Sequence, residues 1–152
     1  SILVPVDGSE HSKRALNCAL ELAEKFGGKI TLIHVYSSVV PMASPMDAIS
    51  APPTMPAQAS PTIAAKLTEE VKRKGVQILD EAGQGVKERG ILVEKLLREG
   101  DAVREIVAAA QEGKFDLIVI GHRGLSKLRE LFLGSVSEGV SHKAPCPVLI
   151  VK

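Results

Sequence analysis

Five short apolar runs alternate with segments of helical periodicity along this chain, and this order constrains its fold more than any other feature. The runs are rich in Val, Ile and Leu, as is typical of strands that are buried on both faces. They cover residues 2–6, 30–36, 91–98, 116–120 and 147–151. Strands that alternate with helices form parallel sheets with crossover helices. The sequence therefore predicts an α/β fold: a five-stranded, doubly wound parallel sheet with helices on both faces.

Capping residues mark the ends of the predicted helices. Ser9 precedes the first helix and can accept a hydrogen bond from its backbone, while Glu10 places a negative charge at the positive helix end. The glycine pair after Phe26 predicts a left-handed stop. Asp101 predicts the start of the helix after the third strand, and a last helix is expected over 134–143.

Residues 37–61 interrupt the alternation with a segment that is rich in proline and methionine. A structureless loop of this length is uncommon inside a compact domain, so we expect an insertion rather than a regular element. Two interpretations stay open for it: the segment covers a ligand or a partner, or it is a solvated loop.

A long helix is expected after this insertion, with Pro61 at its first position. Its predicted core-facing side chains recur at helical spacing and are Ile63, Leu67, Val71, Ile78, Ala82 and Val86. Three glycines are expected to weaken the helix, at positions 75, 83 and 85.

Length and composition limit the protein class. The 152 residues suit one domain over 1–152, and aromatic residues, at 3%, are too few for a platform that stacks nucleic-acid bases. A formal net charge of +1 offers no field that steers the chain toward nucleic acid or an anionic membrane. No apolar run approaches the ~20 residues of a membrane span. With only Cys18 and Cys146 as cysteines, we expect a cytoplasmic protein that binds neither nucleic acid nor membranes.

The predicted strand order, 3-2-1-4-5, locates a ligand site. In doubly wound sheets ligands bind at the carboxyl ends of the strands, where the winding direction reverses, which is here between the first and fourth strands. The segments that leave these two strands are 7–9 and 121–124, and they are the most glycine-punctuated turns of the chain. Topology and local chemistry therefore point to the same edge of the sheet.

The fourth strand is followed by the pattern GxxGx9GS, made by Gly121, Gly124, Gly134 and Ser135. Glycines let the backbone turn tightly and come close to a ligand. Backbone N–H groups at a helix N-terminus attract anions, and the Ser135 hydroxyl adds a donor. The pattern is typical of a phosphate-binding turn.

This spacing, together with VPVDGSEHS near the start and APCPVLIV near the end, resembles the ATP-binding branch of the universal stress protein family over nearly the whole chain. The resemblance implies a Rossmann-like fold of the adenine nucleotide alpha hydrolase-like type, with bound ATP. It also implies Mg²⁺ or Mn²⁺ held through the phosphates, with Asp7 contributing at most indirectly. A homodimer through the edge strand Val148–Val151 is implied as well.

The resemblance assigns roles to residues that match the family's motif positions. Pro5, Val6 and Asp7 would line the adenosine end, with Asp7 facing the ribose, and Val35 and Ile120 would contact adenine. The phosphates would meet the glycine turn and the start of the last helix, at Gly121, Gly124, Gly134, Ser135 and Val136. Arg123 is included among the ligand-binding residues, because the variable positions of the turn either approach the ligand or point to solvent.

Simpler interpretations stand beside these roles. Asp7 can serve only to complement the helix that follows it. Lys127 and Arg129 either neutralise phosphate charge or are solvated. No carboxylate or cysteine spacing accompanies His11, His34 or His142, so these histidines are expected to be structural and no catalytic residue is predicted.

Three functions compete. The first is a nucleotide-dependent stress-response or signalling switch with an unknown protein partner. The second is a slow ATPase or phosphotransferase; the chain has neither a GxxxxGK[ST] loop nor an HRDxxxxN loop, so at most weak ATP hydrolysis is expected. The third is an interaction module that senses AMP or a cyclic adenine nucleotide.

Overall fold

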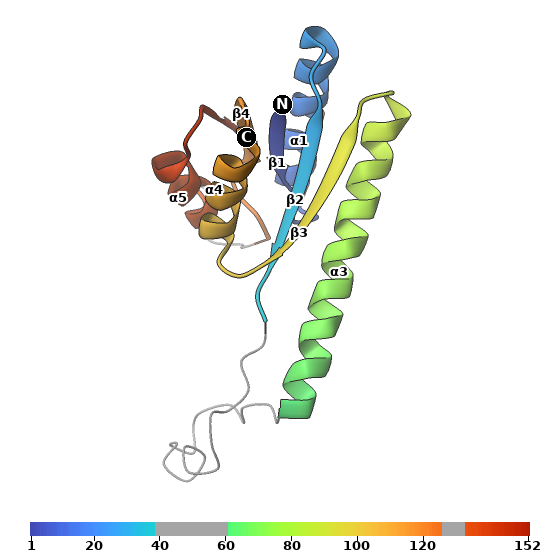
Figure 1. The fold of residues 1–152 in the computed structure, drawn as a ribbon, viewed down its shortest axis with the longest axis vertical. Coiled ribbons are helices and arrows are strands. Elements are labelled where there is room, and N and C mark those ends of the chain that lie inside the picture. Colours follow the sequence, from blue (N-terminus) through green and yellow to red (C-terminus); the bar gives the residue numbers. More distant parts are fainter. Residues whose placement is uncertain (39–60, 126–132) are drawn as a thin grey trace.

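The computed structural model describes residues 1–38, 61–125 and 133–152. Its five strands alternate with helices in the predicted order (Figure 1). The strands are β1 Ile2–Pro5, β2 Ile30–Tyr36, β3 Val93–Glu99, β4 Leu117–Gly121 and β5 Val148–Val151. The described helices are α1 Glu10–Phe26, α3 Pro61–Glu88, α4 Ala102–Gly113 and α5 Ser135–Lys143.

All strand pairs are parallel, and their order is β3-β2-β1-β4-β5, which confirms the prediction. The central strand β1 pairs with β2 along its whole length but with β4 only at Ile2 and Leu3. Both neighbours continue past the end of β1. The sheet therefore opens around the carboxyl end of β1, at the edge where the sequence predicts a ligand.

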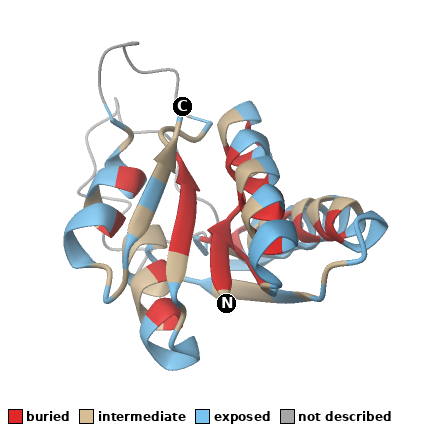
Figure 2. Cartoon of the chain, turned by 90° about the horizontal axis from the view of Figure 1, so that it is seen from above, coloured by how far each residue is buried: buried red, intermediate tan, exposed pale blue. Residues whose placement is uncertain are grey.

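Helices cover both faces of the sheet, and each face has its own apolar core (Figure 2). On one face, α1 and α3 pack onto side chains such as Val4 and Leu32. On the other, α4 and α5 pack onto Leu3, Ile33 and Ile118. Each strand thus supplies alternate residues to opposite layers.

The capping residues act as the sequence predicts. Ser9 is extended, and its hydroxyl accepts from the backbone N–H of Ser12. Gly27 is left-handed with φ 67°, and its N–H donates to the Ala23 carbonyl. At α4 the Asp101 side chain accepts from the N–H of Arg104. Both ends of α1 are therefore capped by the chain itself, by a serine side chain at the start and by a left-handed glycine at the end.

Helix α3 departs from the prediction in its first half. Pro61 is its first residue and so belongs to the helix, not to the insertion, while residues 39–60 of that insertion lie outside the described residues. Ile63 and Leu67 are 52% and 39% exposed, although both were expected in the core. The first turns of α3 extend beyond the sheet, where there is no strand for them to cover (Figure 1). No helix in the described part of the chain is long and apolar enough to span a membrane.

Two of the glycines of α3 pack closely against the sheet, in addition to weakening the helix. Gly75 and Gly83 are buried. A Cβ at Gly83 would lie 2.3 Å from Cε of Lys95 on β3, and a Cβ at Gly75 would meet the His34 ring of β2. These glycines let α3 approach the sheet closely.

Candidate functional site

A cleft with a volume of 560 Å³ lies at the carboxyl ends of β1, β2 and β4. The structure brings all eleven predicted ligand-binding residues to its walls: Pro5, Val6, Asp7, Val35, Ile120, Gly121, Arg123, Gly124, Gly134, Ser135 and Val136. Their contact with a ligand stays a prediction. Their gathering follows from the parallel order, because all the segments that leave the central strands emerge at one edge.

Apolar side chains make up a large part of the cleft lining. Val35 and Ile120 line the cleft together with three residues that the sequence analysis did not assign to a site: Ile33, Ala102 and Ile106. These three belong to strands or helices whose apolar spacing also fits ordinary core positions, so no sequence signal separates them from the core. Leu125 and Leu133 add exposed apolar side chains to the wall and are 72% and 38% exposed.

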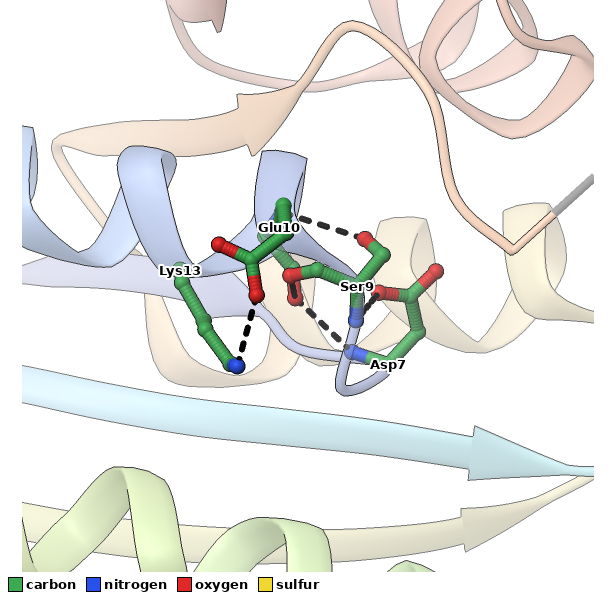
Figure 3. A network of polar contacts seen from close by, with 5 residues as sticks. Asp7, Ser9, Glu10 and Lys13 are labelled. Carbon is green, nitrogen blue, oxygen red and sulfur yellow. Dashed lines mark hydrogen bonds and ion pairs between the residues drawn. The ribbon is translucent and has the colours of Figure 1, made fainter.

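The turn after β1 is held by its own side chains (Figure 3). Oδ1 of Asp7 accepts from the backbone N–H of Ser9 at 2.9 Å, so this carboxylate does help to order the start of α1. The Ser12 hydroxyl donates to the Ser9 carbonyl at 2.9 Å and accepts from the Asp7 N–H at 3.4 Å. Asp7 is only half-buried and lines the cleft. Its structural role therefore leaves the second carboxylate oxygen beside the cavity.

The glycines of the pattern are required by close packing. None of Gly121, Gly124 and Gly134 has a positive φ. A Cβ at Gly124 would lie 2.3 Å from Oδ2 of Asp7, and one at Gly121 would lie 2.7 Å from the carbonyl carbon of His11. The turn after β4 thus packs directly against the turn after β1. This contact brings the two predicted halves of the site together.

Helix α5 begins inside the cleft without a side-chain cap. Its N-cap residue, Gly134, is extended with φ −67° and ψ 145° and donates its N–H to the His122 carbonyl at 2.8 Å. The first N–H that bonds within the helix is that of Glu138, which donates to the Gly134 carbonyl at 2.9 Å. The three preceding residues of the helix, Ser135, Val136 and Ser137, line the cleft. Such helix N-termini favour anions.

The two variable residues of the glycine turn have different surroundings. Arg123 lines the cleft, whereas His122 packs against His11 with ring centroids 4.4 Å apart and nearly perpendicular planes. Nδ1 of His122 is buried and has no hydrogen-bond partner in the described structure. Burial lowers the pKa of His122, and the nearby charge of His11 acts in the same direction. Lys127 and Arg129 lie outside the described residues.

His34 was expected to be merely structural, yet it lines the cleft. Its Nδ1 lies 2.7 Å from the Val6 carbonyl oxygen. No sequence pattern predicted this contact, because no local spacing joins residue 34 to the end of β1.

Among the described residues, the acidic side chains that line the cleft are those of Asp7 and Glu138. Within residues 1–38, 61–125 and 133–152, no three His, Cys, Asp or Glu side chains form a group that could hold a metal ion.

Comparison with known sequences identifies the family. The model of the universal stress protein family matches residues 1–152. Universal stress protein YxiE of Bacillus subtilis is 36% identical over 151 residues, which cover 99% of this chain and 97% of YxiE. Universal stress protein MJ0531 of Methanocaldococcus jannaschii is 33% identical over 151 residues, 99% of this chain and 81% of that protein.

Solved structures agree with the sequence comparison. Universal stress protein UspA from Lactobacillus plantarum has the same fold, with a TM-score of 0.79 at 22% identity over 99% of this chain and 96% of that one. A universal stress protein in complex with cAMP is 27% identical, with a TM-score of 0.67 over 99% and 95%. The universal stress protein from Archaeoglobus fulgidus in complex with dAMP is 25% identical, with a TM-score of 0.63 over 99% and 96%. Sequence and fold together show that this chain belongs to the universal stress protein family.

Proposed function

We propose that the cleft binds an adenine nucleotide, with ATP as the principal ligand, and that the chain acts as a nucleotide-dependent stress-response or signalling switch. The observation that carries this proposal is that the N-terminus of α5 has no side-chain cap and borders a cleft that is also lined by apolar side chains such as Val35 and Ile120. A nucleotide has the matching polarity, with an anionic phosphate end and a flat, weakly polar base. The cAMP and dAMP complexes of similar proteins support the adenine base.

The phosphates would lie against the backbone of Gly124 and the first amides of α5, at Ser135 and Val136. The adenine would lie between the apolar side chains of Val35 and Ile120, which line the same cleft. The Asp7 carboxylate would face the ribose, since Asp7 lines the cleft and only Oδ1 is engaged by the Ser9 N–H. This assignment places each ligand group beside protein groups of matching polarity.

Mg²⁺ or Mn²⁺ would bind through the phosphates rather than through a protein cage. Asp7 and Glu138 line the cleft, and Asp7 would act on the ion only indirectly, through water. The ion would supply charge neutralisation to the triphosphate.

A homodimer would form through the free edge of β5. This strand pairs with β4 on one side only, and Leu149 at its centre is 38% exposed. Exposed edge strands offer unpaired backbone groups that a second strand can join. Bound nucleotide would then act on the dimer or on a protein partner through α5, the helix that precedes β5.

A second candidate function is the sensing of AMP or a cyclic adenine nucleotide. The similar proteins solved with cAMP and dAMP favour it, because both ligands carry a single phosphate. A slow ATPase or phosphotransferase is a third possibility. Turnover above about 1 s⁻¹, the low end of ordinary enzyme rates, would replace the switch by an enzyme.

The test begins with the chain purified without added nucleotide. Mass spectrometry of the small molecules released on denaturation should find ATP near one equivalent. Calorimetric titrations of the emptied chain with ATP, ADP, AMP and cAMP, each with Mg²⁺, then rank the ligands, and tighter AMP or cAMP would select the second candidate. If none of them binds at millimolar concentration, nucleotide binding is refuted.

A further inference from the structure

The hydrogen-bond ladder between β1 and β2 stops at the cleft, one bond short of its expected continuation at Val35. In a parallel sheet, successive residues of a strand turn their backbone groups to alternate neighbours. Ile33 faces β1, since its carbonyl accepts from the Val6 N–H at 2.9 Å. Val35, two residues further on, therefore faces the same side. In a continued ladder, the Val35 N–H would donate to the Val6 carbonyl.

The imidazole of His34 forms a hydrogen bond with the Val6 carbonyl instead. Nδ1 lies 2.7 Å from the Val6 oxygen, and Nδ1 must carry the proton because a carbonyl oxygen only accepts. β1 ends at Pro5, whereas β2 runs on to Tyr36. The side chain thus satisfies the last carbonyl of the β1 edge, and the Val35 amide is left facing the cleft that Val35 lines.

Helix α3 holds the ring in this position from the other side. A Cβ at Gly75 would lie 2.6 Å from Cδ2 and 3.2 Å from Nε2 of His34. A side chain at residue 75 would therefore push the ring from its place. Gly85, on the same helix, has open space around its Cα and provides a matched control.

We propose that His34 is a positioning residue that stops the β1–β2 ladder and keeps the Val35 amide available to the base of a bound nucleotide. The hydrogen bond of His34 and the end of the β1–β2 pairing do not depend on the proposed function, but the consequence for nucleotide affinity rests on that function. Replacing the imidazole with an apolar side chain would leave the Val6 carbonyl unsatisfied. Pairing with the Val35 N–H would then satisfy it and close the base end of the cleft.

Amide hydrogen exchange in the ligand-free chain tests the geometry directly. In the wild type, the Val35 amide should exchange far faster than that of Ile33, which lies within the paired register. His34→Leu and Gly75→Ala should each slow Val35 exchange by about tenfold or more. His34→Asn, whose side-chain N–H can replace Nδ1–H, and Gly85→Ala should leave it unchanged. Equal protection of Val35 and Ile33 in the wild type overturns the proposal, even if a variant fails to fold.

Calorimetry with two probes tests the consequence. His34→Leu should weaken ATP binding about tenfold and change tripolyphosphate binding less than about twofold, because only the base end is altered. His34→Asn should restore ATP affinity. Equal losses for both probes would overturn a role confined to the base. If the wild type binds no ATP, the proposed function fails, and the exchange rates still decide what His34 does.

Discussion

Two helices begin at the same cleft with nearly the same backbone and opposite chemistry. Ser9 before α1 has φ −72° and ψ 158°, and Gly134 before α5 has φ −67° and ψ 145°. The Ser9 hydroxyl accepts from the α1 backbone, and Asp7 adds a second acceptor at the Ser9 N–H. Gly134 brings no side chain, so the first amides of α5 have no acceptor from their N-cap side chain.

The difference between the two helix starts separates residues that stabilise the fold from residues that are proposed to bind a ligand. The first amides of a helix need acceptors, and a chain that serves only stability supplies them from its own side chains, as at α1 and α4. The missing cap makes α5 less stable in the ligand-free chain. It also leaves a helix N-terminus that favours a bound anion. Each of the following changes tests this division.

The largest effect is expected when α5 receives its own acceptor. Gly134→Asp would place a carboxylate on the helix amides, where it competes with phosphate and repels it. ATP affinity should fall about a hundredfold, as expected for the loss of charge-assisted hydrogen bonds. Gly134→Ala is the matched control, because its Cβ meets the same close atoms, 3.1 and 3.2 Å away in His122 and Arg123, without the charge. Equal losses in the two variants would attribute the effect to crowding.

Asp7→Asn tests whether the α1 turn has a ligand role besides its structural one. The amide oxygen can still accept from Ser9 N–H, so the turn should persist. Loss of the carboxylate beside the ribose should weaken ATP binding about tenfold, while tripolyphosphate binding should be unchanged or tighter. Calorimetry with both ligands gives the answer. Unchanged ATP affinity would leave Asp7 only its role at the helix end.

Ser9→Ala removes the cap of α1 and should act on stability alone. The free energy of unfolding should fall by about 1 kcal/mol, which lowers the melting temperature by about 2–4 °C. Affinity for tripolyphosphate should change less than about twofold, because Ser9 is not among the described residues that line the cleft. A strong loss of affinity would show that the two helix ends are not independent.

The smallest expected effect concerns pH. Burial is the main cause that lowers the pKa of His122. The charges of His11, Arg123 and Lys152 lower this pKa further, whereas the hydrogen bond with the Val151 backbone raises it. The unfolded chain therefore takes up this proton at a higher pH than the folded chain does. Stability should be unaffected well above pH 6.5, the ordinary pKa, and should decrease as the pH falls below it. Melting temperatures at about pH 7.5 and 5.5 should differ less in His122→Asn than in the wild type; an equal difference would contradict this role.

Features that depend on local order were predictable. The parallel, doubly wound architecture follows from the alternation of elements, and the caps at Ser9, Gly27 and Asp101 follow from neighbours a few residues away. The eleven candidate residues share one cleft because the topology brings their segments to one edge. For these features, the cause is contained in the spacing of the sequence.

Contacts between distant elements were not predictable in this way. Periodicity identified an apolar face on α3 but not how far the sheet reaches beneath it, so Leu67 was wrongly assigned to the core. The glycine at position 75 was expected to weaken α3, whereas it accommodates the His34 ring. Residues 34 and 75 come into contact only when α3 packs against β2, and no local sequence pattern predicts such a tertiary contact.

An incomplete α5 would also link the lifetime of this protein to its ligand. A nucleotide that supplies the missing acceptors binds only the folded chain, so it adds about 2.7 kcal/mol to stability at a hundred times its dissociation constant. A cell depleted of that nucleotide would hold more chains with a frayed C-terminal helix, and proteases cleave opened segments first. The abundance of the protein, measured as a degradation half-life, would then report the supply of nucleotide without any catalytic step.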